Sequence, residues 1–330
     1  MTAMRVIAIR KPGGPEVLQP QMHPVPAIGA GELLIKVRAA GINRPDVSQR
    51  LGRYPVPADA NPIPGLEVAG VVLAVNDGER RFNVGDRVMA LTHGGGYATH
   101  CVVDASQTLR IPDMLDFASA AALPEVAFTV EFNLIERAGL KSGETVLIHG
   151  GSSGIGSHAI QRAKAAGAKV LVTVGADEKA RFCLELGADQ AFNYKRDDWP
   201  ALIMEKTQAA GVDVVLDMVA GDYLQKNLEI LSVDGRYALI SLQGGRQTSI
   251  DLEPVLRRRL TLVGSTLRPL SKHRKAEIAA RVERDVLPLV AEGRIAPHIC
   301  KTFPLDEAAD AHRLLESGQH LGKIVLLVNE

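Results

Sequence analysis

The sequence predicts a two-domain α/β protein in which a doubly wound parallel sheet is joined to an irregular, β-rich domain. Three observations support this prediction. With 330 residues, the chain is longer than a single hydrophobic core usually serves. Its first 125 residues contain short β-rich runs separated by glycines and prolines. From about Glu125 to Leu267, strand-like and helix-like segments alternate, as they do in parallel sheets.

The pattern of the N-terminal region predicts a mostly antiparallel sheet of short strands. We expect these strands at residues 5–10, 32–40, 68–75, 86–90 and 98–103. Near the C-terminus, a helix through 281–292 precedes a strand at 323–328, which should rejoin this sheet. The β-rich domain therefore comprises residues 1–125 and 269–330, and the α/β domain comprises 126–268.

The central region has the pattern of a parallel sheet. Six strands are expected, at 145–149, 169–174, 190–194, 212–218, 237–241 and 262–267, with helices between most of them. Right-handed crossovers join such strands into a doubly wound sheet. Sheets of this kind bind ligands at the carboxyl ends of their strands, so we look for the site there.

Composition and charge argue against several classes of partner. Lys plus Arg and Asp plus Glu both number 38, so no net field attracts nucleic acid or an anionic membrane. The N-terminus mixes charges into its apolar residues, unlike a signal peptide, and no apolar run approaches the roughly 18 residues of a membrane span. We therefore expect a soluble, cytoplasmic protein.

The cysteines and two glycine-flanked histidines suggest no metal site. Cys101, Cys183 and Cys300 match neither a disulfide framework nor a metal-ligand spacing, so we expect reduced side chains with packing roles. His93 and His100 flank Gly94–Gly96, but neither has a partner at ligand spacing. A surface or packing role is the simpler interpretation of both.

A glycine-rich loop follows the first strand of the central region. Gly154, Gly156 and Ala159 match the G-x-G-x-x-A motif of dinucleotide-binding sites, between a strand and a helix. Gly154 would permit the tight turn, Gly156 would let the backbone approach a pyrophosphate, and Ala159 would let the helix pack closely. With Ser153 and Ile155, these residues predict a Rossmann domain whose helix N-terminus receives the cofactor.

The end of the second strand favours NADPH as the cofactor. NAD-binding sites usually place an acidic residue there, about twenty residues beyond the motif, but this chain has Gly175. Lys179 and Arg181 follow, where a cation could pair with a 2′-phosphate. The alternative is that Asp177 or Glu178 binds the ribose and that the two cations are solvated.

Several motifs resemble the medium-chain dehydrogenase/reductases over nearly the whole chain. They are KPGGPEVL, AAGINRPDVSQRLGRYP, IPGLEVAGVV, FNVGDRVMAL, AAALPEVAFT, LIHGGSSGIG, LGADQAFNY and LGKIVL. Zinc-dependent relatives have Cys where this chain has Asn43 and Gly-His-Glu where it has Gly65-Leu66-Glu67; they also carry a four-cysteine lobe that is missing here. The resemblance therefore implies a zinc-independent enzyme with a GroES-like catalytic domain. Glu67 should be satisfied by backbone donors.

Among the zinc-independent branches, NRPDVSQRLGRYP, EVAFTVEF and FNYK most resemble the NADPH:quinone oxidoreductases. That likeness implies a homodimer joined through the cofactor domains. It also implies a set of site residues. Asn43 and Tyr54 would lie beside the nicotinamide and substrate, Thr129 would contact the cofactor, and Lys179 with Tyr194 would bind the 2′-phosphate. The nicotinamide groove would be lined by Val219, Ser241, Gly244, Ser265 and Leu267.

Without a metal to stabilise an alkoxide, an electrophilic acceptor such as a quinone or an enone is expected. Tyr54 would donate a proton or stack on a flat ring, and Asn43 would donate a hydrogen bond, although Tyr54 could also be a packed loop aromatic.

Two other functions stay open. One is reduction of an enoyl thioester, with Arg257–Arg259 as a basic patch for its phosphates. The other is a non-catalytic, crystallin-like or RNA-binding role, which overall neutrality disfavours. Arg257–Arg259 and Lys272–Lys275 are most simply solvated helix or turn residues.

Overall fold

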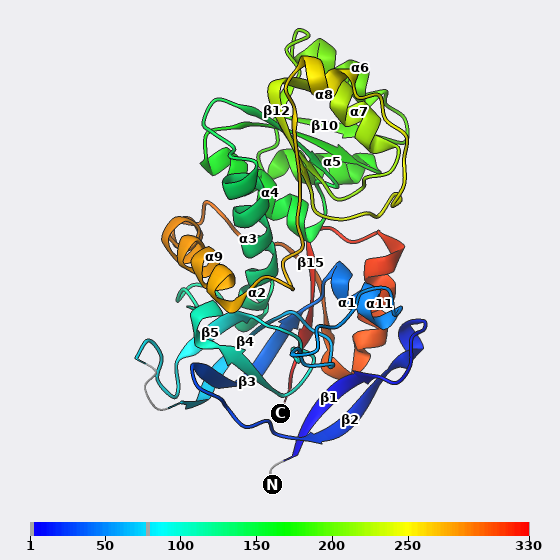
Figure 1. The fold of residues 1–330 in the computed structure, drawn as a ribbon. Helices are drawn as coiled ribbons and strands as arrows, with labels where there is room; N and C mark the ends of the chain where they lie inside the picture. The colour runs from blue at the N-terminus through cyan, green and yellow to red at the C-terminus, as the bar shows by residue number, and fades with distance from the viewer. Residues whose placement is uncertain (1–2, 77–79, 330) are drawn as a thin grey trace. The chain divides into compact units, whose positions relative to one another are not determined.

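The computed structural model describes residues 3–76 and 80–329, which form two compact units. Unit 1 contains Met1–Phe128, Arg268–Ala291 and Pro297–Glu330, and unit 2 contains Thr129–Leu267 with Glu292–Ala296 (Figure 1). As limits of separately folding domains, 1–125 with 269–330 and 126–268 remain a prediction, which limited proteolysis would test.

Unit 1 is built on a mostly antiparallel sheet, as predicted. Seven strands form it, in the order β14-β15-β3-β4-β5-β7 with β6 paired to β3, while β1 and β2 form a separate antiparallel pair. The bounds are β1 Ala3–Ile9, β2 Leu18–Pro24, β3 Glu32–Gly41, β4 Glu67–Val75, β5 Arg87–Leu91, β6 His100–Asp104, β7 Thr108–Arg110, β14 Ile299–Pro304 and β15 Lys323–Leu327.

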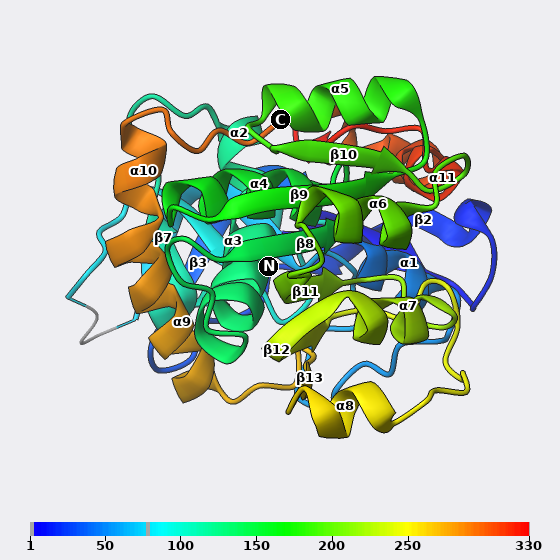
Figure 2. The ribbon, with the colours of Figure 1, turned by 90° about the horizontal axis from the view of Figure 1, so that it is seen from above.

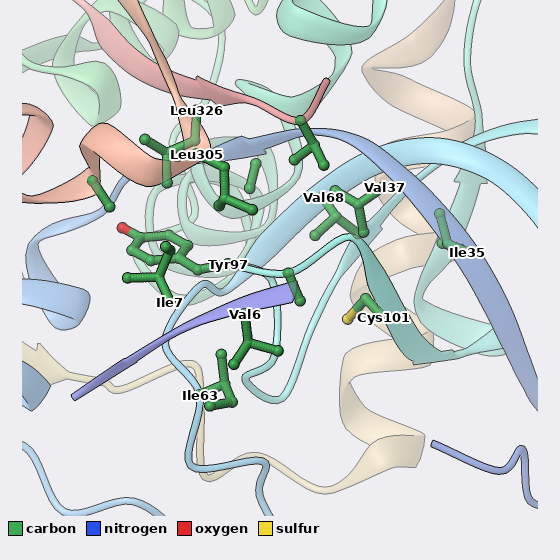
Figure 3. Close-up of a cluster of buried hydrophobic side chains, with 14 of the residues drawn as sticks. Val6, Ile7, Ile35, Val37, Ile63, Val68, Tyr97, Cys101, Leu305 and Leu326 are labelled. Carbon is green, nitrogen blue, oxygen red and sulfur yellow. The ribbon is translucent and has the colours of Figure 1, made fainter. Parts of the chain in front are cut away.

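The hydrophobic core of unit 1 explains why its short strands are stable. Alternate residues of β3 point inward, so Leu33, Ile35 and Val37 are buried while the residues between them are partly exposed. Figure 3 shows the Tyr97 ring beside Ile7, in a cluster that gathers side chains from distant parts of the chain. The C-terminal strand β15 pairs with β3 through Val325 and Gly41, which confirms that the end of the chain rejoins the first sheet.

Helices around this sheet begin at recognisable sequence signals. Asn43 caps α1, Asp116 caps α2 and Ser271 caps α9. Their bounds are η1 Pro15–Val17, α1 Arg44–Arg50, η2 Ala105–Gln107, α2 Phe117–Ala121, α3 Pro124–Val130, α9 Lys272–Asp285, α10 Leu287–Ala291, η4 Leu305–Glu307 and α11 Ala308–Ser317. The helix predicted at 281–292 is in fact two helices, because α9 ends at Asp285 and α10 begins at Leu287.

Unit 2 is a doubly wound α/β domain of the Rossmann type, as predicted. Its six parallel strands follow the order β10-β9-β8-β11-β12-β13, and Figure 2 shows them side by side. The bounds are η3 Glu131–Arg137, β8 Thr145–His149, α4 Gly154–Ala165, β9 Lys169–Val174, α5 Asp177–Glu185, β10 Gln190–Asn193, α6 Trp199–Lys206, β11 Val212–Asp217, α7 Tyr223–Ile230, β12 Leu231–Leu239, α8 Glu253–Arg257 and β13 Thr261–Gly264.

The sequence missed three strands and misplaced two others. β2, β7 and β14 are short or contain proline, so they lack a clear alternating pattern. β12 begins at Leu231, six residues earlier than predicted, and β13 ends at Gly264, three residues early. Throughout residues 3–76 and 80–329, every helix is too short or too polar to cross a bilayer.

Candidate active site

The loop between β8 and α4 in unit 2 has the geometry of an anion-binding turn. Ser153 caps α4, and its Oγ accepts a hydrogen bond from the Gly156 amide at 3.0 Å. A side chain at Gly156 would lie 2.3 Å from the Gly150 carbonyl oxygen, so only glycine fits there. The amides of Gly154 and Ile155 precede the first intrahelical hydrogen bond of α4 and can donate to a bound phosphate.

The structure corrects the role expected of Gly154. The tight turn is made by Gly150, whose φ of +65° favours glycine, whereas Gly154 is the first residue of α4. Ala159 is fully buried on the helix face, in agreement with close packing. Gly151 is also required, because its Cβ would lie 2.8 Å from Val172 Cβ.

At the end of β9, Tyr194 covers Gly175. A Cβ at Gly175 would lie 2.5 Å from the Tyr194 hydroxyl oxygen, so no acidic side chain fits while Tyr194 holds this position. Asp177 is occupied by other partners, because its carboxylate accepts from Asn193 Nδ2 at 3.0 Å and from Arg196 Nη1 at 3.1 Å. These two partners lower the pKa of Asp177. Lys179 is half-buried in the first turn of α5.

A buried polar network supports the carboxyl ends of β8, β9, β11 and β12. His149 bonds to Thr173 Oγ1 and to Asn227 Oδ1, each at 2.8 Å, and burial lowers the pKa of His149. Asp217 accepts hydrogen bonds from Asn227 and, at 2.6 Å, from the Tyr237 hydroxyl.

Asp217 also fixes the loop that follows β11. Its Oδ1 accepts from the Val219 amide at 2.5 Å, and its carboxylate accepts from the Ala220 amide. Ala220 has a φ of +61°, which is uncommon for a residue with a side chain. The network therefore holds the backbone of Ala220, next to Val219, in a costly conformation.

The other predicted groove residues of unit 2 lie on loops near these strand ends. The Gly244 amide donates to the Val219 carbonyl at 2.7 Å, and the Ser265 hydroxyl donates to Asn133 Oδ1 at 2.6 Å. The Thr129 carbonyl accepts from Asn133 Nδ2 at 2.9 Å. Ser241 and Leu267 are half-buried. The structure thus connects Val219 with Gly244, and Ser265 and Thr129 through Asn133.

In unit 1, Asn43 belongs to a buried ion-pair cluster. Lys323 Nζ lies 2.6 Å from both Glu67 Oε1 and Asn43 Oδ1, and it also donates to the Ile42 carbonyl. Asn43 Nδ2 donates to Glu67 Oε1 at 2.8 Å, and the Glu125 amide donates to Glu67 Oε2 at 2.9 Å. Glu67 is therefore satisfied by one backbone donor, as expected, and by two side chains that sequence reasoning did not include.

Asp46 fixes the backbone at Asn43 and at Gly65. It accepts hydrogen bonds from the amides of Asn43 and Gly65 and from the Tyr97 hydroxyl. Burial nevertheless raises the pKa of Asp46 to about 6. The Tyr97 hydroxyl also lies 3.0 Å from His312 Nε2, and burial lowers the pKa of this histidine to about 3.

Tyr54 is half-buried beneath a buried guanidinium group. The Arg268 Cζ lies 5.7 Å from the centre of the Tyr54 ring, and Arg268 Nη1 donates to Gln49 Oε1 at 2.7 Å. Within the described residues, Arg268 Nε and Nη2 are buried and have no hydrogen-bond partner. Burial, and next the charge of Glu125, raise the pKa of Tyr54 to about 12.

Lys275 lies in the first turn of α9 and is buried, not solvated as expected from the sequence. Its Nζ is 3.4 Å from His93 Nδ1, and burial lowers its pKa. The other ring nitrogen of His93 contacts Asp59 at 3.3 Å, in keeping with the packing role expected for this histidine. Lys275 also interacts electrostatically with Glu125 and with Arg268.

Sequence reasoning missed Asp46, Glu125, Asp217, Arg268 and Lys323 as members of these clusters. A charged residue inside an apolar run, such as Asp217 or Lys323, is the one signal that could have found them.

The structure also corrects the expectation for one cysteine. Cys101 and Cys183 are buried, but Cys300 is exposed and has no packing role. In the described ranges, no group of three or more His, Cys, Asp or Glu side chains could hold a metal ion.

Comparisons with known proteins place these features in a family. Residues 154–284 match the profile of zinc-binding dehydrogenases, and residues 29–113 match that of the alcohol dehydrogenase GroES-like domain. A quinone oxidoreductase of Rattus norvegicus is 34% identical over 330 residues, 98% of each chain. A crystal structure of Escherichia coli quinone oxidoreductase complexed with NADPH has a TM-score of 0.87 and 30% identity, covering 99% of this chain and 100% of that one. An NAD-dependent alcohol dehydrogenase structure has a TM-score of 0.86 at 30% identity, covering 98% and 100%.

Proposed function

The chain belongs to the medium-chain dehydrogenase/reductases, among the quinone oxidoreductases, and we propose that it transfers hydride from NADPH to a quinone or similar conjugated carbonyl without zinc. The observation that carries this proposal is the combination of a glycine-rich anion-binding turn with a covered Gly175. The turn suits a pyrophosphate. Gly175 stands where an acidic residue would select NAD, and Tyr194 fills the space that such a side chain would need.

NADPH is preferred over NADH on the geometry at the end of β9. Tyr194 occupies the space that an acidic side chain at position 175 would need, and Asp177 is engaged by Asn193 and Arg196. Lys179, half-buried in the first turn of α5, can approach a 2′-phosphate. The alternative in which Asp177 binds the ribose is therefore disfavoured.

A zinc-free reaction is supported by the charge balance around Asn43. The Lys323 ammonium lies 2.6 Å from Glu67 Oε1, so the acidic group of this cluster is already neutralised by a cation of the protein. Metal analysis of the purified protein should find less than about one zinc in ten chains, and a chelator should leave turnover unchanged. Stoichiometric zinc near Asn43 would contradict the proposal.

NADPH, when bound, supplies the hydride, and the chain contributes positioning and proton transfer. The turn capped by Ser153, with Gly156 and the first amides of α4, would hold the pyrophosphate in place. Asp217 fixes the loop at Val219, which would border the nicotinamide. Tyr54 offers an aromatic surface to a flat ring, and its high pKa makes it a stacking residue in preference to a proton donor.

Stopped-flow measurement of NADPH oxidation with a panel of quinones and enones tests the function directly. We expect turnover with ortho- or para-quinones and slower turnover with simple enones, which are weaker electrophiles. Faster turnover with an enoyl thioester would favour the enoyl-reductase alternative. Salt-sensitive RNA binding without any turnover would favour the non-catalytic one.

Lys179→Ala tests the cofactor preference. The variant should bind NADPH about 1–3 kcal/mol more weakly, because a charge-assisted contact to the 2′-phosphate is lost, and should bind NADH as before. Fluorescence titration with both cofactors measures this difference. Arg181→Ala, an exposed residue of the same helix, is the matched control. Equal losses of affinity for both cofactors would mean that Lys179 does not bind the 2′-phosphate.

We also propose that the protein is a homodimer joined through the cofactor domains and that it acts in the cytoplasm. β13 ends the six-stranded sheet with Leu262 exposed, and Leu256 of α8 is 81% exposed, an apolar surface that a second copy could cover. Analytical ultracentrifugation should give a dimer, which Leu262→Lys should weaken. Because Cys300 is exposed and unpaired, a reducing compartment suits this chain.

A further inference from the structure

Glu125 is a buried acid whose carboxyl group has no hydrogen-bond partner in the part of the chain that the structure describes. Its side chain is 8% exposed, and no hydrogen bond or ion pair joins its carboxyl to any other residue within 3–76 and 80–329. Its backbone amide donates to Glu67 Oε2 at 2.9 Å. Since buried carboxyl groups are normally hydrogen-bonded, an unpartnered one points to a role outside stability.

The charges that act most strongly on Glu125 come from four elements. Glu67 of β4 and Asp46 of α1 disfavour its ionised form, whereas Lys323 of β15 and Lys275 of α9 favour it. Burial outweighs all of them, and with Glu67 it raises the pKa of Glu125 to about 8. Glu125 is therefore largely protonated at neutral pH.

The two neighbouring glutamates consequently have different chemistry. Glu67 accepts hydrogen bonds from Lys323, Asn43 and the Glu125 amide, so both of its oxygens are engaged as acceptors. Glu125 retains a proton that it can release to a stronger base. A protonated carboxyl group beside a hydrogen-bonded carboxylate is a recurring arrangement around catalytic acids.

Glu125 also acts electrostatically on the aromatic surface proposed for the substrate. Burial, and next the charge of Glu125, raise the pKa of Tyr54, whereas burial lowers the pKa of the Arg268 guanidinium beside that ring. With a pKa of about 12, the Tyr54 hydroxyl is the weaker acid of the two. Arg268 and Lys275 add positive charge in the same region, which would stabilise an oxyanion.

We propose that Glu125 is the acid that protonates the oxygen of the reduced substrate. This inference rests on the proposed function. Hydride from NADPH brings two electrons and one hydrogen to the quinone or enone, and negative charge develops on the conjugated oxygen. The carboxyl O–H of Glu125 then breaks as the substrate O–H bond forms, and the Glu125 carboxylate regains its proton from water. NADPH, the substrate and one solvent proton yield NADP⁺ and the hydroquinone or enol.

Glu125→Gln tests this role, because the amide keeps the shape but has no acidic proton. At pH 7, kcat should fall about 100-fold with poorly acidic hydroquinone products and much less with electron-poor quinones, whose products need no protonation. The wild-type kcat should decline above about pH 8, and the variant should lack this decline. Glu125→Asp should restore part of the rate. A melting temperature no lower than that of the wild type and unchanged NADPH binding would show that the fold is intact.

Infrared difference spectroscopy provides a measurement that does not depend on turnover. Between pH 6 and pH 10 the wild type should lose a protonated-carboxyl band that Glu125→Gln lacks. Equal kcat values and equal pH profiles for wild type and Glu125→Gln would overturn this role while leaving quinone reduction in place. The absence of the band at pH 6 would overturn it as well. If the wild type oxidised no NADPH with any acceptor, both proposals would fall.

Discussion

The two units of this protein each contain a buried polar network, but the networks differ in how completely their groups are paired. In unit 2, His149, Asn227, Asp217 and Tyr237 form a chain of hydrogen bonds that ends on the backbone of the loop after β11. In unit 1, the cluster around Glu67 leaves Glu125 without a partner, and Arg268 keeps two nitrogens unsatisfied among the described residues.

This difference distinguishes a network that fixes the backbone from a group that takes part in the reaction. A fully paired network fixes a backbone, since each lost hydrogen bond would leave a costly buried group. An unpaired acid contributes nothing to stability and is retained at a cost, so we assign it to the reaction. Changing a fully paired residue of either network should therefore lower stability, whereas replacing Glu125 should not, and the following measurements test that contrast.

The largest expected effect is the pH dependence of stability at Glu125. Its pKa is raised on folding, from 4.5 to about 8, so the folded state binds the proton more tightly than the unfolded state does. Stability is highest below the unfolded pKa, falls as pH rises towards 8, and then levels off. Relative to Glu125→Gln, the wild type should lose up to about 5 kcal/mol between pH 4.5 and pH 9.

Urea unfolding of both proteins at several pH values measures this loss. A constant difference between wild type and Glu125→Gln across the range would mean that Glu125 is ionised in the folded protein at neutral pH. Such a result would also weaken the case for Glu125 as the proton donor.

Breaking the ion pair of unit 1 should have the next largest effect. Lys323→Met leaves Glu67 buried without its cation, which should lower the free energy of unfolding by about 3–5 kcal/mol. The double variant with Glu67→Gln should recover much of this loss, because the uncompensated charge is then removed. Lys11→Met, at an exposed lysine, is the control. A loss no larger than that of the control would mean that water replaces the ammonium group.

Asp217→Asn should have a smaller effect on stability but also reduce cofactor binding. An amide has one acceptor oxygen, whereas the Asp217 carboxylate serves two amides, Asn227 and the Tyr237 hydroxyl. We expect a loss of about 2–3 kcal/mol in stability and weaker NADPH binding, because the loop at Val219 is released. Tyr237→Phe removes one of these bonds and should cost about 1 kcal/mol. Unchanged NADPH affinity in Asp217→Asn would separate the network from the cofactor.

The smallest expected effect concerns Gly175, because a side chain at this position would affect both the packing of Tyr194 and the preference for NADPH. Gly175→Asp should weaken NADPH binding about tenfold, roughly 1.4 kcal/mol, without improving NADH binding, because the new side chain collides with Tyr194. Adding Tyr194→Ala should make room for the carboxylate and allow NADH to bind. An improvement with Gly175→Asp alone would show that Tyr194 moves easily.

The sequence by itself determined the parallel sheet of unit 2, its glycine loop and the return of the C-terminal strand to the first sheet. These features follow from local patterns, such as apolar runs, helix caps and glycines at fixed spacing. It also predicts Gly175 and Lys179 as cofactor-binding residues, because the acidic residue expected at a known distance from the motif is absent.

Only the tertiary structure decided that Asn43 is held by Lys323, that Lys275 is buried, and that the Glu125 carboxyl has no hydrogen-bond partner among the described residues. Asn43 and Lys323 are 280 positions apart, and no local pattern reveals such a contact. The reason is physical: a side chain's ionisation depends on burial and on neighbouring charges, which are set by strand pairing and packing in space.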